Sequence, residues 1–242
     1  MKPWAIIILL WGLLLPASAL PPGVEPRADR LVAEMSQYLG SLQAFSLHAE
    51  VSLDESISGM QVELANSTDV FVRRPDGLRV SRQGDKGHQE AFYDGKLLTL
   101  FNPDQSFYAQ SEAPGGLEPM LDYANAKLGL TMPLADLLFV DAHGGLTRDT
   151  QAGFYVGESL VDGTRCDHLA FVQNSGVEWQ IWIEQGATRF PRKLVIRHPE
   201  TDGAPRFEAV LSKWNTAPQF AANQFQFEAP AGARKIDFRR TK

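Results

Sequence analysis

The sequence predicts an α+β fold in which a curved antiparallel meander of strands is preceded by one helix and interrupted by others. Apolar residues recur at helical spacing before residue 43, alternate with polar residues over 45–54, and return to helical spacing after residue 116. Turn-forming dipeptides separate the alternating segments. Runs of hairpins with helices segregated from them are typical of folds in which helices cover one face of a sheet.

The first predicted elements are a helix and a strand. Residues 31–42 form the helix, because Leu31, Met35 and Leu39 share one face at helical spacing. Residues 45–54 alternate strictly, with every odd position apolar and every even one polar. That period predicts a strand with one buried and one wet face.

Turn chemistry divides the next segment into hairpins. Asp94-Gly95-Lys96 is typical of a tight hairpin turn, because Asp and Gly both tolerate positive φ. Asn102-Pro103-Asp104-Gln105 marks the next turn. The strands predicted here cover residues 61–73, 77–83, 89–93, 97–101 and 106–110.

The helical period returns after Pro114-Gly115-Gly116. Leu117, Met120 and Leu121 share one face, which predicts a helix over 117–128. A second short helix is expected to begin at Pro133, since proline favours the first helical turn. Strands are then predicted over residues 154–161, 165–172, 177–184, 192–198 and 207–214.

The first nineteen residues predict a cleaved export signal. An apolar run over residues 4–15 is followed by Ala17-Ser18-Ala19, the small-x-small pattern of a signal peptidase site. The run is shorter than the roughly 20 residues that a membrane helix needs. We expect cleavage between Ala19 and Leu20, and a periplasmic mature protein without a transmembrane segment.

The remaining chain is expected to hold a disordered leader at residues 20–27 and one domain at 28–242. The formal net charge is −6, and it becomes −7 once Lys2 is removed with the signal. An acidic protein gains no attraction to nucleic acid, so no nucleic-acid partner is expected. Cys166 is the only cysteine, which excludes an internal disulfide. No cofactor is expected.

Two segments resemble the periplasmic lipoprotein carrier group of LolA. Phe71-Val72-Arg73-Arg74-Pro75-Asp76-Gly77 is similar to a strand–turn–strand segment of that group. Phe92-Tyr93-Asp94-Gly95-Lys96 is similar to its hairpin. The likeness is one of fold, and it is strongest over residues 45–110.

The chain from residue 28 to residue 238 also resembles a bacterial periplasmic family known as domain of unknown function 2092. Pro133-Leu134-Ala135-Asp136-Leu137-Leu138, Trp179-Gln180-Ile181-Trp182-Ile183 and Phe190-Pro191-Arg192-Lys193-Leu194 carry this likeness. The two resemblances imply an unclosed half β-barrel whose helices plug an apolar concavity. Relatives of that fold, namely LolA, LolB and RseB, carry or sense acyl chains.

The resemblance therefore implies a non-enzymatic periplasmic protein that binds a lipid or acylated ligand in the half-barrel, as a carrier or an envelope sensor. The alternative is an interaction module of the cell envelope, with a filled core and no ligand, that docks onto a membrane-anchored partner.

The candidate cavity residues are apolar positions on alternating strands and on the lid helix. The same residues fit either a ligand pocket or an ordinary core, since apolar alternation is common to every half-buried sheet. They are Leu47, Ala49, Val51, Val70, Val72, Leu78, Val80, Leu137 and Leu138.

The basic cluster of Arg73, Arg74 and Arg79, with Arg82 and Lys96 nearby, admits two interpretations. One is a solvated strand face and turn. The other is a rim at the mouth of the cavity that binds a phosphate or carboxylate headgroup.

Two further sets of residues carry candidate chemistry. Cys166 and His168 stand two apart on a predicted strand, so both side chains point to one face and an activated thiol is the enzymatic alternative to a buried structural cysteine. Asp136, Asp141 and His143 follow the lid helix, but their spacing matches no established metal site, so no metal is expected.

Trp179 and Trp182 are expected on opposite faces of one strand, because an odd separation reverses the side-chain direction. One of them should lie in the core, and the other is a candidate for a partner surface.

Overall fold

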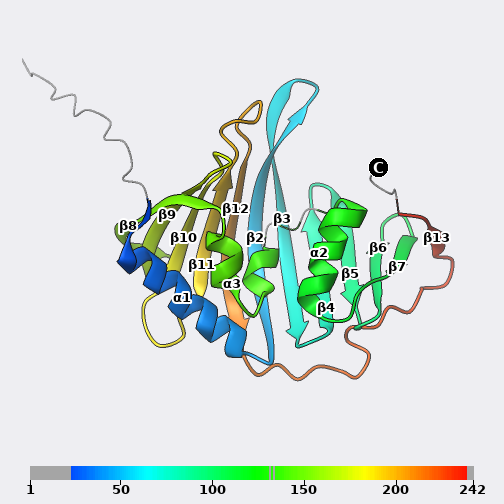
Figure 1. Ribbon diagram of the computed structural model, residues 1–242. Coiled ribbons are helices and arrows are strands. Elements are labelled where there is room, and N and C mark those ends of the chain that lie inside the picture. The colour runs from blue at the N-terminus through cyan, green and yellow to red at the C-terminus, as the bar shows by residue number, and fades with distance from the viewer. Residues whose placement is uncertain (1–22, 131, 133, 239–242) are drawn as a thin grey trace, which may run out of the picture.

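A computed structural model describes residues 23–130, 132 and 134–238. Within these residues thirteen strands form one sheet, and the helices lie together on one of its faces (Figure 1). The sheet order is β1-β8-β9-β10-β11-β12-β2-β3-β4-β5-β6-β7-β13. This confirms the predicted α+β fold with an open antiparallel meander.

The strands are β1 (Gly23–Val24), β2 (Ala44–Ile57), β3 (Met60–Arg73), β4 (Gly77–Gly84), β5 (Gly87–Tyr93), β6 (Leu97–Asn102), β7 (Phe107–Glu112), β8 (Thr150–Val161), β9 (Thr164–Gln173), β10 (Glu178–Glu184), β11 (Pro191–Arg197), β12 (Arg206–Asn215) and β13 (Arg234–Ile236). The helices are α1 (Pro26–Ser41), α2 (Leu117–Leu128), the 3-10 helix η1 (Ala135–Leu138) and α3 (Ala142–Thr147). No helix in the described part of the chain is long and apolar enough to span a membrane.

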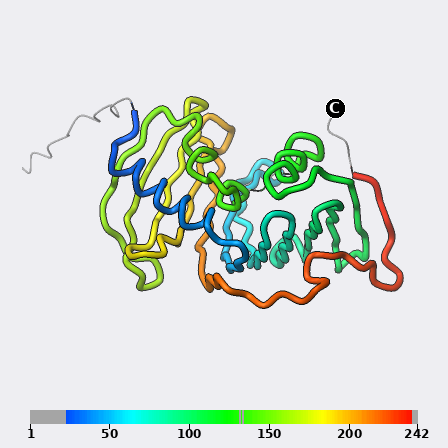
Figure 2. Tube along the Cα trace, turned by 60° about the horizontal axis from the view of Figure 1, so that its bottom comes forward, coloured from blue at the N-terminus to red at the C-terminus, as the bar shows by residue number. Residues whose placement is uncertain are grey.

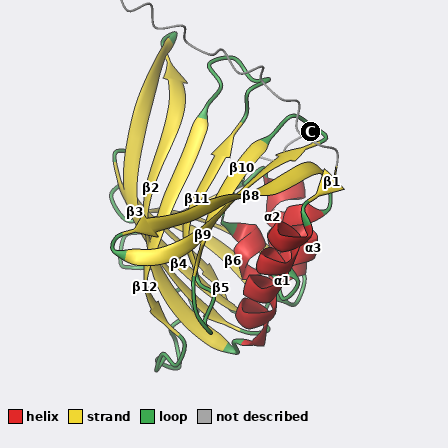
Figure 3. Ribbon diagram, turned by 90° about the vertical axis from the view of Figure 1, so that its left-hand side faces the viewer, coloured by secondary structure: helices red, strands yellow, loops and turns green. Residues whose placement is uncertain are grey.

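The two halves of the sheet are joined by β12 and β2, which are far apart in sequence. These strands pair antiparallel, with Ala209 opposite Val51. At the outer edges the short strands β1 and β13 pair in parallel with β8 and β7. The two edges are not paired with each other, so the sheet curves around the helices without closing (Figure 3).

The concave face of the sheet and the helices share one apolar core. Strict alternation along β2 directs Phe45, Leu47 and Ala49 inward, where all three are buried. The helical stripe that includes Met35 and Leu39 packs into the same cluster. Burial of each such large side chain stabilises the fold by roughly 1.5–3 kcal/mol.

The expected disordered leader differs from the structure in its last five residues. Gly23–Val24 form β1, which pairs with Ala152 and Gly153 of β8. Helix α1 begins at Pro26, whose missing N–H costs nothing in the first helical turn. Residues 20–22, the export signal and its cleavage position lie outside the described residues.

The lid differs from the single short helix expected from Pro133, a residue outside the described part. It comprises η1 and the separate helix α3. The first segment ends at Leu138, and Asp141 begins the second, because its side chain accepts a hydrogen bond from the backbone N–H of Gly144 at 2.9 Å.

The chain after β12 crosses the convex, outer face of the sheet before it forms β13 (Figure 2). Phe225 is buried there, and Phe220 packs edge to face against Phe71 of β3. Phe227 contacts Phe92 and Tyr108, with ring centroids 5.5 and 5.1 Å apart. This segment was not predicted.

Candidate functional site on the concave face

Strand register places one apolar row across six strands of the concave face. We call it the crossing row, and successive strand pairings connect its members, which are Phe171, Trp179, Ile196, Phe207, Leu53 and Leu64. The next row of paired residues, formed by Leu169, Ile181 and Leu194, belongs to the core.

The crossing row is less buried at its β2–β3 end. Phe171, Trp179 and Phe207 are buried and Ile196 between them is half-buried, whereas both last members, Leu53 and Leu64, are half-buried. Apolar side chains therefore extend beyond the part of the concave face that the helices cover.

The exposed continuation lies on the hairpin of β2 and β3, which projects past the helices in Figure 1. Ile57 and Met60 face each other at its tip, and they are 45% and 67% exposed. Val62, on the same face of the hairpin, is half-buried. Apolar side chains thus continue from the core to the tip of the hairpin, with one ion pair among them, because Glu55 lies opposite Val62 on this face and pairs with Lys86.

The predicted cavity residues come together in the core beneath the helices. Val51 and Val80 are partly buried against it, and the others are buried. In this structure their side chains pack against one another and against the helices. The buried members are Leu47, Ala49, Val70, Val72, Leu78, Leu137 and Leu138.

The inserted helical layer, consisting of α2, η1 and α3, is bonded to itself, to α1 and to the sheet. The hydroxyl groups of Tyr123 of α2 and Ser111 of β7 share a hydrogen bond at 2.8 Å. His143 of α3 bonds Asp29 of α1 through its ring, at 2.7 Å, and Ser36 through its backbone N–H, at 2.9 Å. Glu118 of α2 accepts a hydrogen bond from the N–H of Val140, at 2.6 Å. Among the hydrogen bonds of the described residues, none joins η1 or α3 to a strand of the concave face. These two segments meet the sheet through apolar side chains.

The three arginines predicted as a headgroup rim do not share one surface. Arg74 donates to the backbone oxygens of Leu42 and Phe139, at 3.1 and 3.4 Å, and burial lowers its pKa. Arg73 and Arg79 lie on the convex face, where their guanidinium groups cover the rings of Phe225 and Phe92. Both occupy outward-facing positions of their strands, so they cannot line the mouth of a cavity on the concave face.

Arg82 is the member of the cluster that lies on the concave face. It is opposite Thr68 on β3, in the same alternating set as Val80, and it donates to Gln89. Counting alternate residues from Val80 could have identified it from the sequence.

Cys166 and His168 share the outward side of β9, as their spacing predicted, but they are engaged separately. Cys166 is fully buried, and burial raises the pKa of its thiol to about 11. The ring of His168 stacks on Trp182, with centroids 4.0 Å apart, and bonds Gln180. Burial lowers the pKa of His168.

Asp136, Asp141 and His143 serve different structural contacts. Asp141 caps α3 and His143 bonds Asp29, whereas burial raises the pKa of Asp136. Among the described residues, no group of three or more His, Cys, Asp or Glu side chains is arranged to hold a metal ion.

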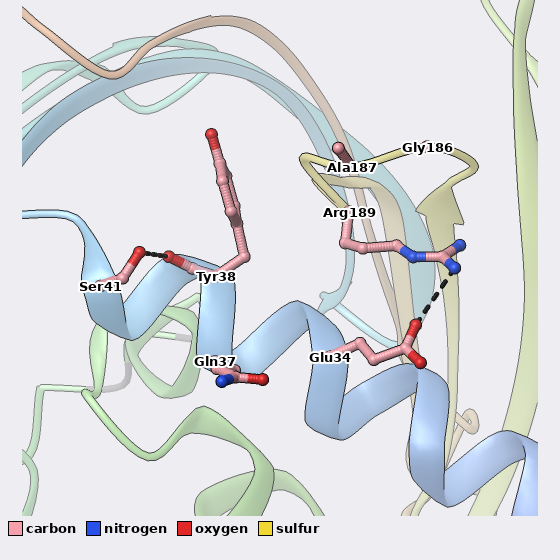
Figure 4. A pocket seen from close by; sticks show the side chains of 7 residues that line it. All are labelled: Glu34, Gln37, Tyr38, Ser41, Gly186, Ala187 and Arg189. Atoms are coloured by element: carbon pink, nitrogen blue, oxygen red, sulfur yellow. Dashed lines mark hydrogen bonds and ion pairs between the residues drawn. The ribbon is translucent and has the colours of Figure 1, made fainter.

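A surface hollow of about 490 Å³ lies between α1 and the β10–β11 loop (Figure 4). Tyr38 projects from α1 into it, and its ring packs edge to face on Phe190. Glu34 pairs with Arg189 across the hollow, at 3.1 Å. Its charged groups are neutralised by each other, so the hollow offers no uncompensated charge to a ligand.

Trp179 and Trp182 lie on opposite faces, which confirms their predicted arrangement. Trp179 belongs to the crossing row, whereas Trp182 borders a hollow of about 410 Å³ on the convex face together with Arg197 and Arg206.

Comparison with solved structures supports the fold. Lipoprotein LppX of Mycobacterium tuberculosis has a TM-score of 0.51 and 16% identity, over 81% of this chain and 98% of that one. LprF of Mycobacterium bovis has a TM-score of 0.51 and 14% identity, over 83% and 98%. An uncharacterised conserved protein of Thermus thermophilus has a TM-score of 0.50 and 10% identity, over 87% and 99%. At these identities the likeness is one of fold.

No curated protein sequence matches the chain. Residues 28–239 match the family described as "Predicted periplasmic protein (DUF2092)". This match covers most of the chain and agrees with the resemblance seen in its sequence motifs. The chain belongs to this periplasmic family.

Proposed function

We propose that this protein is a non-enzymatic envelope protein that binds an acyl chain on the concave face of its half-barrel, as a carrier or a sensor. The observation that carries the proposal is the crossing row with its exposed continuation on the β2–β3 hairpin. An apolar surface that begins in the core and emerges at the edge is a path for a hydrophobic ligand.

The energetics favour a ligand on this surface. Burial of apolar area contributes roughly 25 cal/mol per Å². Leu53, Leu64 and Ile196 are only half-buried, so a chain that lay over them would remove further apolar surface from water.

Deeper binding requires η1 and α3 to separate from the sheet while α2 stays bonded to β7 through Tyr123 and Ser111. Because η1 and α3 meet the concave face through apolar side chains, the described hydrogen bond that this movement strains is the one from Arg74 to the backbone oxygen of Phe139. An acyl chain replaces the lost contacts with equivalent ones, which offsets the cost of opening.

The non-enzymatic part of the proposal is supported by the state of the candidate thiol. Cys166 is buried and its raised pKa keeps it protonated at neutral pH, whereas nucleophilic cysteines act as thiolates. His168 lies under Trp182 and bonds Gln180, and no hydrogen bond to Cys166 occurs among the described contacts.

The test is uptake of a fluorescent fatty acid by the mature protein, by Leu53→Asp and by the control Leu160→Asp. Leu53 lies in the crossing row, whereas Leu160 is an exposed apolar residue on β8. We expect Leu53→Asp to lower the affinity at least ten-fold while Leu160→Asp retains it, with circular dichroism verifying both folds. Equal binding by a folded Leu53→Asp variant would contradict the proposal. Co-purification of a specific envelope protein in place of a lipid would favour the interaction module.

A further inference from the structure

The concave face contains a buried polar atom that has no protein partner. The side chain of Trp179 is in the crossing row and only 3% of the residue is exposed, yet its indole Nε1 has no hydrogen-bond partner among the described residues. Its ring is held against Phe171, with centroids 4.0 Å apart and planes 9° from parallel. The position of this N–H is therefore fixed by packing.

A second unpartnered atom lies at the same end of the sheet. The buried Oγ1 of Thr150, the first residue of β8, also has no partner among the described residues. Thr150 is paired with Gln173, two residues from Phe171 on β9, while Trp179 is paired with Phe171 itself. Since β9 separates the two strands, they lie about 10 Å apart.

Unpartnered polar groups of this kind are costly. More than about 90% of buried polar groups in folded proteins have a hydrogen-bond partner. Leaving one unsatisfied costs about 1–3 kcal/mol. An indole N–H can only donate, so its missing partner must be an acceptor.

We propose that this end of the concave face holds the carbonyl end of the acyl ligand, an ester or a carboxyl group, and that Trp179 Nε1 donates to its carbonyl oxygen. The Thr150 hydroxyl lies at the same end of the sheet, on the far side of β9, and is available to a further polar group of the ligand. This inference rests on the proposed function and adds the chemical class and the orientation of the ligand.

The row accommodates a chain in this orientation. From Trp179 on β10 to Leu64 on β3 the crossing row spans four strand spacings, about 19 Å. That length matches an extended palmitoyl chain. The chain then ends at the β2–β3 hairpin, where the apolar surface is exposed.

The experiment compares palmitate, methyl palmitate and hexadecane, delivered from cyclodextrin, as competitors of a fluorescent alkyl probe. Trp179→Phe keeps an aromatic ring on Phe171 but removes the N–H. Trp214→Phe is the matched control, since its Nε1 is also buried and unpartnered among the described residues but its ring packs on Phe190 and Phe45. Arg82→Gln tests the arginine of the concave face.

We expect Trp179→Phe to weaken binding of a carbonyl ligand roughly five-fold, as the loss of one neutral hydrogen bond implies. Hexadecane should be unaffected, and Trp214→Phe and Arg82→Gln should keep the preference for the carbonyl ligands. The ratio of palmitate to methyl palmitate affinity in the unmodified protein distinguishes a free acid from an ester. Equal effects of Trp179→Phe on all three ligands, no effect on any, or loss of the preference in Trp214→Phe or Arg82→Gln would overturn the inference.

Nuclear magnetic resonance of the indole ¹⁵N–¹H groups supplies a test in the unmodified protein. The Trp179 indole proton should move downfield with methyl palmitate and not with hexadecane. An identical response to both would overturn the inference while leaving the proposed function intact. Binding of none of the three ligands would instead contradict the proposed function.

Discussion

Asp167 on β9 and Arg189 in the β10–β11 loop form an ion pair, with Oδ2 and Nη1 3.3 Å apart, at one end of the concave face. Asp167 is only 4% exposed, and it also accepts hydrogen bonds from Tyr155 and Gln185, at 3.1 and 3.2 Å. Arg189 in turn pairs with Glu34 of α1. The pair thereby fixes the first helix against the sheet.

Replacement of Asp167 by Ala should lower the free energy of unfolding by about 3 kcal/mol, because Arg189 loses the more buried of its two carboxylate partners and the donors Tyr155 and Gln185 lose their acceptor. Urea unfolding measures the change. Glu158→Ala is the control, since Glu158 forms only an exposed ion pair with Arg165, at 4.0 Å, and such pairs contribute about 0–1 kcal/mol. Similar losses in the two variants would show that the Asp167 contacts are as weak as surface pairs.

His48 should make stability depend on pH. Hydrogen bonds to Asp69 and Glu50 raise its pKa above the ordinary value of 6.5. A raised folded pKa means that the stabilisation is complete below pH 6.5 and is lost as the pH rises through the folded value. His168 has a lowered pKa, so its effect on the pH dependence of stability is opposite to that of His48. It is present both in the unmodified protein and in the His48→Gln variant that is compared with it.

The measurement for His48 is the difference in unfolding free energy between the unmodified protein and His48→Gln, taken from about pH 5 to about pH 9. The unmodified protein should have its largest advantage at the acidic end. An advantage that grows toward alkaline pH would contradict the assignment.

Phe225 should anchor the C-terminal segment to the convex face. It is 2% exposed, Phe220 packs on it edge to face at 5.1 Å, and Arg73 covers its ring at 4.7 Å. Phe225→Ala should cost about 3 kcal/mol and expose residues 216–233 to proteolysis. Gln219→Ala, at an exposed position of the same segment, should change neither. Unchanged proteolysis in Phe225→Ala would show that the segment is held elsewhere.

Cys166 should resist alkylation in the folded protein. Its burial and a thiol pKa of about 11 leave little thiolate at about pH 8, so iodoacetamide should react only after unfolding. Mass spectrometry with and without urea measures the labelling. Rapid modification of the folded protein would revive the thiol-enzyme alternative.

Strand positions could be predicted well from the sequence because alternation and turn chemistry are local. The strand predicted over 45–54 corresponds to β2, and the one over 77–83 corresponds to β4. The segment from residue 216 to β13 could not be predicted, since it has no periodicity and its order comes from Phe225 and Phe227 packing on distant strands. Strand β1 was missed because two residues carry no period.

The candidate site was predictable in part. Alternation identified inward residues such as Leu47 and Val72, but it could not identify the crossing row, which requires the register between β12 and β2. The rim prediction grouped Arg73, Arg74 and Arg79 by proximity in sequence, although strand alternation and the turn at Arg74 send them to different surroundings.

The central claim is that the concave face binds an acyl chain, and the most direct measurement is mass spectrometry of lipid extracted from the mature protein after purification from its native periplasm. The account predicts one acyl species at close to one molecule per chain, carrying an ester or carboxyl group. A protein that contains no lipid and also fails to take up a fluorescent fatty acid would contradict it.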